Sequence, residues 1–94
     1  MATLSQLIGA VNGFLAAAGL STIAKVSIDV ALNEIEIKLA AQTELDKVSP
    51  ILQTYTGYQA VTEGLGWHVS MVTHQGTQPT TGYNFRCFFE GVLQ

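Results

Sequence analysis

The chain begins with a stretch whose apolar residues recur at helical spacing. The intervals of three and four residues typical of one helix face are kept by Leu4, Leu7, Ile8, Val11, Leu15 and Ala18. Thr3 followed by Gln6 is a capping-box pattern, and Gly19 suits the position just after a last helical turn. These signals predict a helix from Thr3 to Ala18.

Two stretches with a period of two follow this helix. The apolar positions are Ala24, Val26, Ile28 and Val30 in the first stretch and Ile35, Ile37, Leu39 and Ala41 in the second. This alternation is typical of half-buried strands. A two-residue turn at Leu32–Asn33 joins them into a hairpin with matching faces, which places Asp29 opposite Glu36.

In the second half of the chain, a helix is again followed by strands. Thr43 with Asp46 resembles a capping box at the start of a second helix. Helical spacing continues through Leu45, Val48, Leu52 and Tyr55, and Gly57 ends the helix. Pro50 either kinks this helix or caps a fresh start. Residues 58–66 fit neither period. Residues 67–74 and 83–90 alternate as strands around a loop at 75–82, and the alternation places Trp67, Tyr83, Phe85, Cys87 and Phe89 in the core.

The element order α-β-β-α-β-β defines the expected fold. We expect one α+β domain over residues 1–94, with an antiparallel sheet of about four strands and two helices packed on one face. A chain of 94 residues buries about 64% of its unfolded surface, enough for a single core.

Composition excludes several classes of protein. Only 12% of the residues are charged, the hydrophobic fraction is 48%, and the net charge is −3, which argues against disorder. Four Lys and Arg residues are too few for a nucleic-acid binder. A single cysteine and the absence of Lys or Arg before Lys25 predict a cytoplasmic protein in a reducing compartment, with neither a signal peptide nor a membrane span.

The few charges are unevenly distributed. Residues 1–24 carry none, whereas seven of the eleven charged residues fall on the predicted outer face of the sheet: Lys25, Asp29, Glu34, Glu36, Lys38, Arg86 and Glu90. The side of the first helix opposite its apolar stripe has only small or uncharged residues: Gly9, Ala10, Asn12, Gly13, Ala16 and Ala17.

A helix without charge on any side is unusual in contact with water. Gly9, Asn12, Gly13, Ala16 and Ala17 therefore form a candidate interface for self-association, because small residues let a second helix approach closely. Two alternatives stay open: the helix lies between the sheet and the second helix, or it touches a membrane surface.

A second candidate site is the outer face of the sheet. Phe88 and Val72 interrupt its polar pattern, and with His68, Ser70, His74 and Arg86 they form a candidate platform for a protein partner or a small ligand. The facing carboxylates of Asp29 and Glu36 need neutralisation, either by a cation or basic partner or by Lys25, Lys38 or Arg86. His68 and His74 stand about 20 Å apart along a strand and cannot share a metal, so no metal or cofactor is expected.

No pairing of a nucleophile with a base points to an enzyme. The sequence therefore predicts a non-enzymatic binding or assembly protein that acts as a homo-oligomer through its first helix, with a composition that suits a viral (phage-type) or bacterial accessory or structural protein. The alternative is a module that binds a small ligand at a subunit interface or on the outer sheet face.

Overall fold

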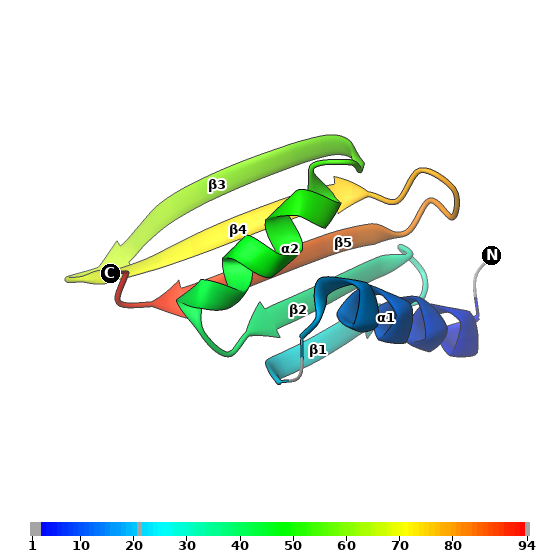
Figure 1. The fold of residues 1–94 in the computed structure, drawn as a ribbon, viewed down its shortest axis with the longest axis horizontal. Coiled ribbons are helices and arrows are strands. Elements are labelled where there is room, and N and C mark those ends of the chain that lie inside the picture. The colour runs from blue at the N-terminus through cyan, green and yellow to red at the C-terminus, as the bar shows by residue number, and fades with distance from the viewer. Residues whose placement is uncertain (1–2, 21, 94) are drawn as a thin grey trace.

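The computed structural model describes residues 3–20 and 22–93. In chain order the elements are α1 (Leu4–Ala18), β1 (Ile23–Asp29), β2 (Glu34–Leu39), the short 3-10 helix η1 (Gln42–Glu44), α2 (Leu45–Leu52), β3 (Thr56–Gly66), β4 (Val69–Thr77) and β5 (Asn84–Gly91). The strands form one sheet in the order β1-β2-β5-β4-β3 (Figure 1). Both α-helices lie against the same face of this sheet, so the α+β class is confirmed.

The predicted sheet of about four antiparallel strands is wrong in two respects. The described residues form five strands, and β5 pairs in parallel with β2 while it pairs antiparallel with β4. The C-terminal strand therefore enters the sheet between the β1–β2 and β3–β4 hairpins. The strand missed in the sequence is β3, whose residues are exposed on both faces except for the half-buried Tyr58, so no half-buried alternation marks it.

The first helix forms as its capping signals predict. The Thr3 hydroxyl accepts a hydrogen bond from the Gln6 backbone N–H, the Gln6 side chain accepts one from the Thr3 N–H, and Gly19 ends the helix with φ of 69°. The face that packs on the sheet is centred on Leu7, Val11, Phe14 and Ala18. The predicted stripe was therefore partly wrong, because Leu4 and Ile8 are about half exposed.

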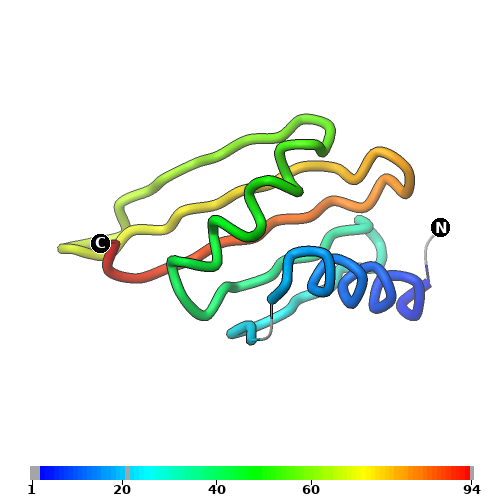
Figure 2. Tube along the Cα trace, in the orientation of Figure 1, coloured from blue at the N-terminus to red at the C-terminus, as the bar shows by residue number. Residues whose placement is uncertain are grey.

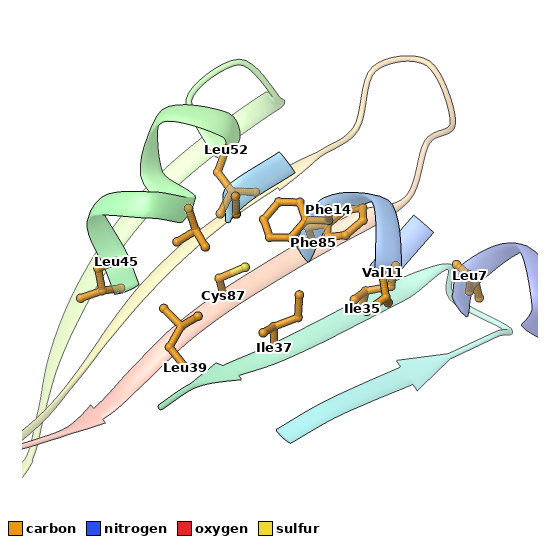
Figure 3. Packing of buried hydrophobic residues seen from close by; sticks show 12 residues of the cluster. Leu7, Val11, Phe14, Ile35, Ile37, Leu39, Leu45, Leu52, Phe85 and Cys87 are labelled. Carbon is orange, nitrogen blue, oxygen red and sulfur yellow. The ribbon is translucent and has the colours of Figure 1, made fainter. Parts of the chain in front are cut away.

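The core lies between the two helices and the sheet (Figure 3). Phe14 of α1 stacks on Phe85 of β5, with 4.8 Å between the ring centroids. The remaining buried apolar residues come from β2, α2 and β5: Ile35, Ile37, Leu39, Leu45, Val48, Leu52 and Cys87. Cys87 and Phe85 are thus core residues as expected, while Tyr83 and Phe89 are half-buried at its margin.

The β1–β2 hairpin has a longer turn than predicted. Its connection spans Val30–Asn33, so Asp29 faces Glu34 instead of Glu36. The Asp29 carboxylate accepts a hydrogen bond from the Leu32 backbone N–H at 3.1 Å, and Asn33 adopts φ of 52°. Because the register moves by two residues, each strand keeps the face that its alternation predicts.

The β3–β4 hairpin reaches beyond the ends of its neighbouring strands, toward the side where the C-terminus lies (Figure 2). Its turn consists of Trp67 and His68, and His68 has φ of 64°. The second helix is shorter than predicted: η1 precedes it, and α2 contains only eight residues, with Pro50 accommodated inside it. In the part of the chain that is described, no helix is long and apolar enough to cross a membrane.

Candidate functional site

The outer side of α1 stays uncovered by the rest of the described chain. Gly9, Asn12, Gly13, Ala16 and Ala17 are all exposed, and a Cβ atom added at Gly9 or Gly13 would meet no atom within 4 Å. The alternative that the helix lies between the sheet and α2 is therefore wrong. The five small or uncharged residues remain on one accessible surface, here called the α1 outer face.

Exposed apolar side chains adjoin the α1 outer face. Leu4 is 53% exposed and Ile8 is 45% exposed, and at 100° per residue both lie on the flank between the buried stripe and the small residues. Burial of such a surface against another apolar surface is favourable, because it removes apolar area from water.

The sheet face away from the helices, here called the open face, consists of rows of side chains that cross the strands. One row contains Ser27, Glu36, Arg86, Gln75 and Gln59, and the next contains Asp29, Glu34, Asn84, Thr77 and Thr56. The seven charged residues assigned to the outer face in the sequence lie on this face, because each has a register partner there or belongs to the same strand alternation.

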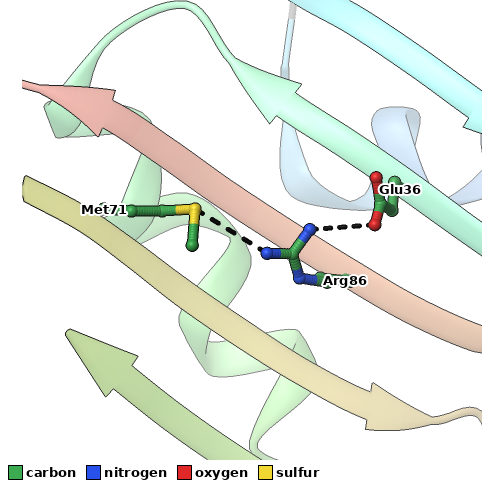
Figure 4. A network of polar contacts seen from close by, with 3 residues as sticks. All are labelled: Glu36, Met71 and Arg86. Atoms are coloured by element: carbon green, nitrogen blue, oxygen red, sulfur yellow. Dashed lines mark hydrogen bonds and ion pairs between the residues drawn. The ribbon is translucent and has the colours of Figure 1, made fainter. Parts of the chain in front are cut away.

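Arg86 is the centre of the polar contacts on the open face (Figure 4). Its guanidinium donates to Glu36 Oε2 at 2.9 Å and contacts Met71 Sδ at 3.7 Å, and it lies 4.8 Å from the centroid of the Phe88 ring. Glu36 is thus neutralised within the chain, as one of the two sequence interpretations expected. The guanidinium is held in place by three neighbours, which makes it a rigid donor.

Around Arg86 the two polar rows enclose a hollow of about 380 Å³. Its polar lining comprises Glu34, Glu36, Gln75, Thr77, Asn84 and Arg86. Two side-chain hydrogen bonds stiffen its rim: Gln75 donates to Gln59 at 3.0 Å, and Thr77 donates to Asn84 at 2.7 Å. Sequence reasoning placed Glu34, Glu36 and Arg86 on this face but missed Gln75, Thr77 and Asn84, because β5 pairs with β2 only through the unexpected parallel register.

A third row of the open face is apolar in its part toward β3. Phe88 pairs with Thr73, and Thr73 pairs with Val61. Thr73 is only 5% exposed although no helix covers it, which is consistent with shielding by these two neighbours. Val61 and Leu65 themselves are 39% and 47% exposed. The open face therefore has two polar rows that cross all five described strands and a third row that is apolar from β5 to the edge strand β3.

The six-residue platform proposed from the sequence is not brought together. Arg86 and Phe88 lie on the open face, but Ser70, Val72 and His74 alternate onto the helix-covered face, where Val72 faces Phe89 and His74 faces Cys87. His68 belongs to the hairpin turn. The assignment of β4 faces was wrong because the apolar series Trp67, Val69 and Met71 resembles a core-facing alternation.

On the helix-covered face His74 forms a polar pair with Tyr58. The Tyr58 hydroxyl and His74 Nδ1 are 2.7 Å apart, and the two rings are stacked with centroids 5.9 Å apart. Burial lowers the pKa of His74 below its usual 6.5, and the charge of Asp46 partly opposes this shift. The imidazole is therefore neutral near pH 7.

Cys87 lies directly across from His74 in the β4–β5 pairing. A histidine beside a cysteine activates the thiol only when the thiolate is accessible and stabilised. Burial instead raises the pKa of the Cys87 thiol to about 12, and the side chain is fully buried. This pairing has the character of a core contact and not of a nucleophile with its base.

Trp67 at the hairpin turn is 88% exposed, so the prediction that it is a core residue is wrong. Its indole ring meets the His68 ring edge-on, with centroids 5.1 Å apart. No group of three or more His, Cys, Asp or Glu side chains in the described ranges is arranged to hold a metal ion. Comparisons with models of known protein families, with characterised proteins and with solved structures found no match to this chain.

Proposed function

We propose that this protein is a non-enzymatic binding or assembly protein that acts as a homo-oligomer, and that the α1 outer face is a contact between its copies. The observation that carries this proposal is an exposed helix face with no charged residue: Gly9, Asn12, Gly13, Ala16 and Ala17 all reach the surface. A helix in permanent contact with water usually places charged residues on its exposed side.

The residue sizes on this face favour a second helix as the occupant. Gly9 and Gly13 are separated by about one helical turn, and Ala16 and Ala17 continue the row. Packed helices approach to 8–10 Å, depending on the side chains at the contact. Exposed Leu4 and Ile8 would then be buried at the margin of the contact. A second copy of α1 fits because an isologous contact brings the same uncharged surface to both sides.

The test replaces the two glycines by a bulky residue that the isolated chain accepts. In Gly9→Leu with Gly13→Leu, the free space around both positions leaves the fold intact, and leucine raises helix propensity by about 1 kcal/mol at each site. We expect a lower oligomer mass by native mass spectrometry, with an unchanged far-UV circular dichroism spectrum.

The matched control is Gly9→Ala with Gly13→Ala, which gives the same gain in helix propensity with little added bulk. We expect this variant to keep the wild-type mass. A wild-type protein that is monomeric at micromolar concentration, or a leucine variant that keeps the full oligomer mass, would contradict the proposal.

The polar hollow on the open face favours a second candidate function, the binding of a small polar ligand. The lining of this hollow has two carboxylates, Glu34 and Glu36, against the one guanidinium of Arg86, which is ion-paired with Glu36, and Gln75 and Thr77 supply neutral polar groups. A screen of small amines and amino acids by thermal shift tests this function. Binding should raise the melting temperature of the wild type and leave that of Glu34→Gln unchanged.

A further inference from the structure

A second exposed surface lies at the opposite end of the sheet from β1. β3 is an edge strand of 11 residues, the longest strand in the described part of the chain. It is exposed along nearly its whole length. Natural proteins protect such edges with lysines, prolines or covering elements, because unpaired backbone groups there recruit other strands. β3 contains one charged residue, Glu63, and neither lysine nor proline. Its pairing with β4 is irregular near both ends, which leaves Gln59 to Gly64 as a regular stretch of exposed edge.

We propose that β3 pairs antiparallel with β3 of a second copy, about a two-fold axis that passes through Val61. In this register the residue numbers of facing pairs add up to 122, so Val61 faces itself. The two sheets then join into one continuous sheet of ten strands, since the described chain contributes five. An axis perpendicular to the sheet keeps the α-helices of both copies on the same side.

The argument for a second copy is the self-complementarity of the strand in this register. β3 pairs regularly with β4 from Gln59 to Gly64 and is bulged on either side of this stretch, so a two-fold axis at Val61 lies near the middle of the regular part. In this register Ala60 faces Thr62 of the other copy on the helix-covered side. Tyr58, whose ring stacks on His74 within the chain, lies outside the regular part.

The charges also fit this register. Glu63 faces Gln59, so the two carboxylates of the pair do not face each other. Like charges directly opposite each other in a ladder are destabilising, whereas a glutamine opposite a glutamate brings no second charge to the pair. On the open face Gln59, Val61 and Glu63 would form a closed set of three cross-strand pairs with the same residues of the other copy.

The apolar part of the third row gives the pairing a hydrophobic component. Val61 is 39% exposed in the single chain and would contact Val61 of the other copy at the axis. Beside it, Thr73 and Phe88 continue the same row in each sheet. The apolar rows of the two copies thereby become one patch across the joined edge.

The test compares two single variants, each with one added lysine, at two positions on the same face of β3. Val61→Lys places two lysines opposite each other at the axis, so the dissociation constant of the β3 contact should rise at least tenfold. Gln59→Lys places each lysine opposite Glu63 of the other copy, and two favourable pairs should lower the dissociation constant by roughly 2- to 30-fold. Analytical ultracentrifugation of both variants measures these constants.

This opposite response separates the proposed register from a general effect of charge on a strand edge, which would weaken association in both variants. Equal constants for wild type, Val61→Lys and Gln59→Lys, or weaker association in both, would overturn the proposal.

Performing the same measurements on the Gly9→Leu, Gly13→Leu chain makes this result independent of the α1 contact. If α1 forms a contact between copies, the association that remains in this double variant reports the β3 contact alone. If α1 does not, the substitutions change nothing and the wild type already reports β3.

Discussion

Cys87 illustrates how burial sets the chemistry of a single residue. It is the only cysteine of the chain, and burial raises the pKa of its thiol to about 12 from an ordinary value of 9.0. We expect native protein to resist thiol reagents at pH 8 and to react only as fast as it unfolds, because the thiolate is the reactive form. Rapid labelling of folded protein would contradict this placement.

The same shift predicts a pH dependence of stability. Below pH 9 the thiol is protonated in both states. Between pH 9 and about 12 the unfolded chain loses the proton while the folded chain keeps it, so the free energy of unfolding falls over this range. Urea denaturation at pH 8 and pH 10 should show a larger fall for wild type than for Cys87→Ala. Tyr55 titrates in both proteins; its pKa is raised mainly by burial and further by the neighbouring Cys87, so the difference between the variants reports Cys87 together with its effect on Tyr55.

His74 should act at the other end of the pH scale. Its folded pKa is lowered by burial, so the folded state favours the neutral imidazole that contacts the Tyr58 hydroxyl. Stability from this residue is present above pH 6.5 and falls as the pH decreases through 6.5 toward the folded pKa. Between pH 7.5 and 5.5, wild type should lose more stability in urea than His74→Gln. Equal losses would exclude this role.

Single residues also mark the limits of sequence reasoning. Cys87 and Phe85 could be assigned to the core from alternation alone, and both are buried. Trp67 could not, because a large aromatic residue is expected in a core, yet here it occupies a two-residue turn and is 88% exposed. Its neighbour His68 gives no turn signal in the sequence, because the turn requires a positive φ that histidine adopts only occasionally.

At the level of elements, the contact between β4 and the segment that joins α2 to β3 depends on a missing side chain. A Cβ at Gly76 would lie 2.8 Å from Tyr55 Cβ, a distance that atoms do not adopt without movement. Gly76→Ala should therefore destabilise the fold by about 1–3 kcal/mol. Gly66→Ala in the same hairpin has open space around it and should be neutral or slightly stabilising. Equal midpoints of thermal unfolding for the two variants would contradict this close packing.

The elements differ in how much of them the sequence predicts. α1 was predictable because its capping residues and its termination at Gly19 act locally, and the structure has both. β3 was not, since an edge strand exposed on both faces lacks the alternation that burial imposes. The parallel pairing of β2 with β5 joins residues about 50 positions apart, and no local signal specifies it. The polar hollow around Arg86 depends on this pairing and was missed for the same reason.

At the scale of the whole molecule, the proposed surfaces lie on different elements. The α1 outer face belongs to the helix layer, whereas β3 is the edge strand farthest from β1 in the sheet order. Two isologous contacts on different parts of one chain link more than two copies, either in a closed assembly or in a continuing one. Loss of either contact should leave a dimer held by the other. The sparse charge of the chain, 12% of its residues, reflects in this account a large share of surface that is buried between copies.

Native mass spectrometry of the wild type and of Gly9→Leu with Gly13→Leu tests the central claim most directly. We predict that the wild type is a multiple of the 10.0 kDa chain and that the variant, with an unchanged circular dichroism spectrum, has a lower mass. A wild type found at 10.0 kDa, or a variant with the full wild-type mass, would contradict the account.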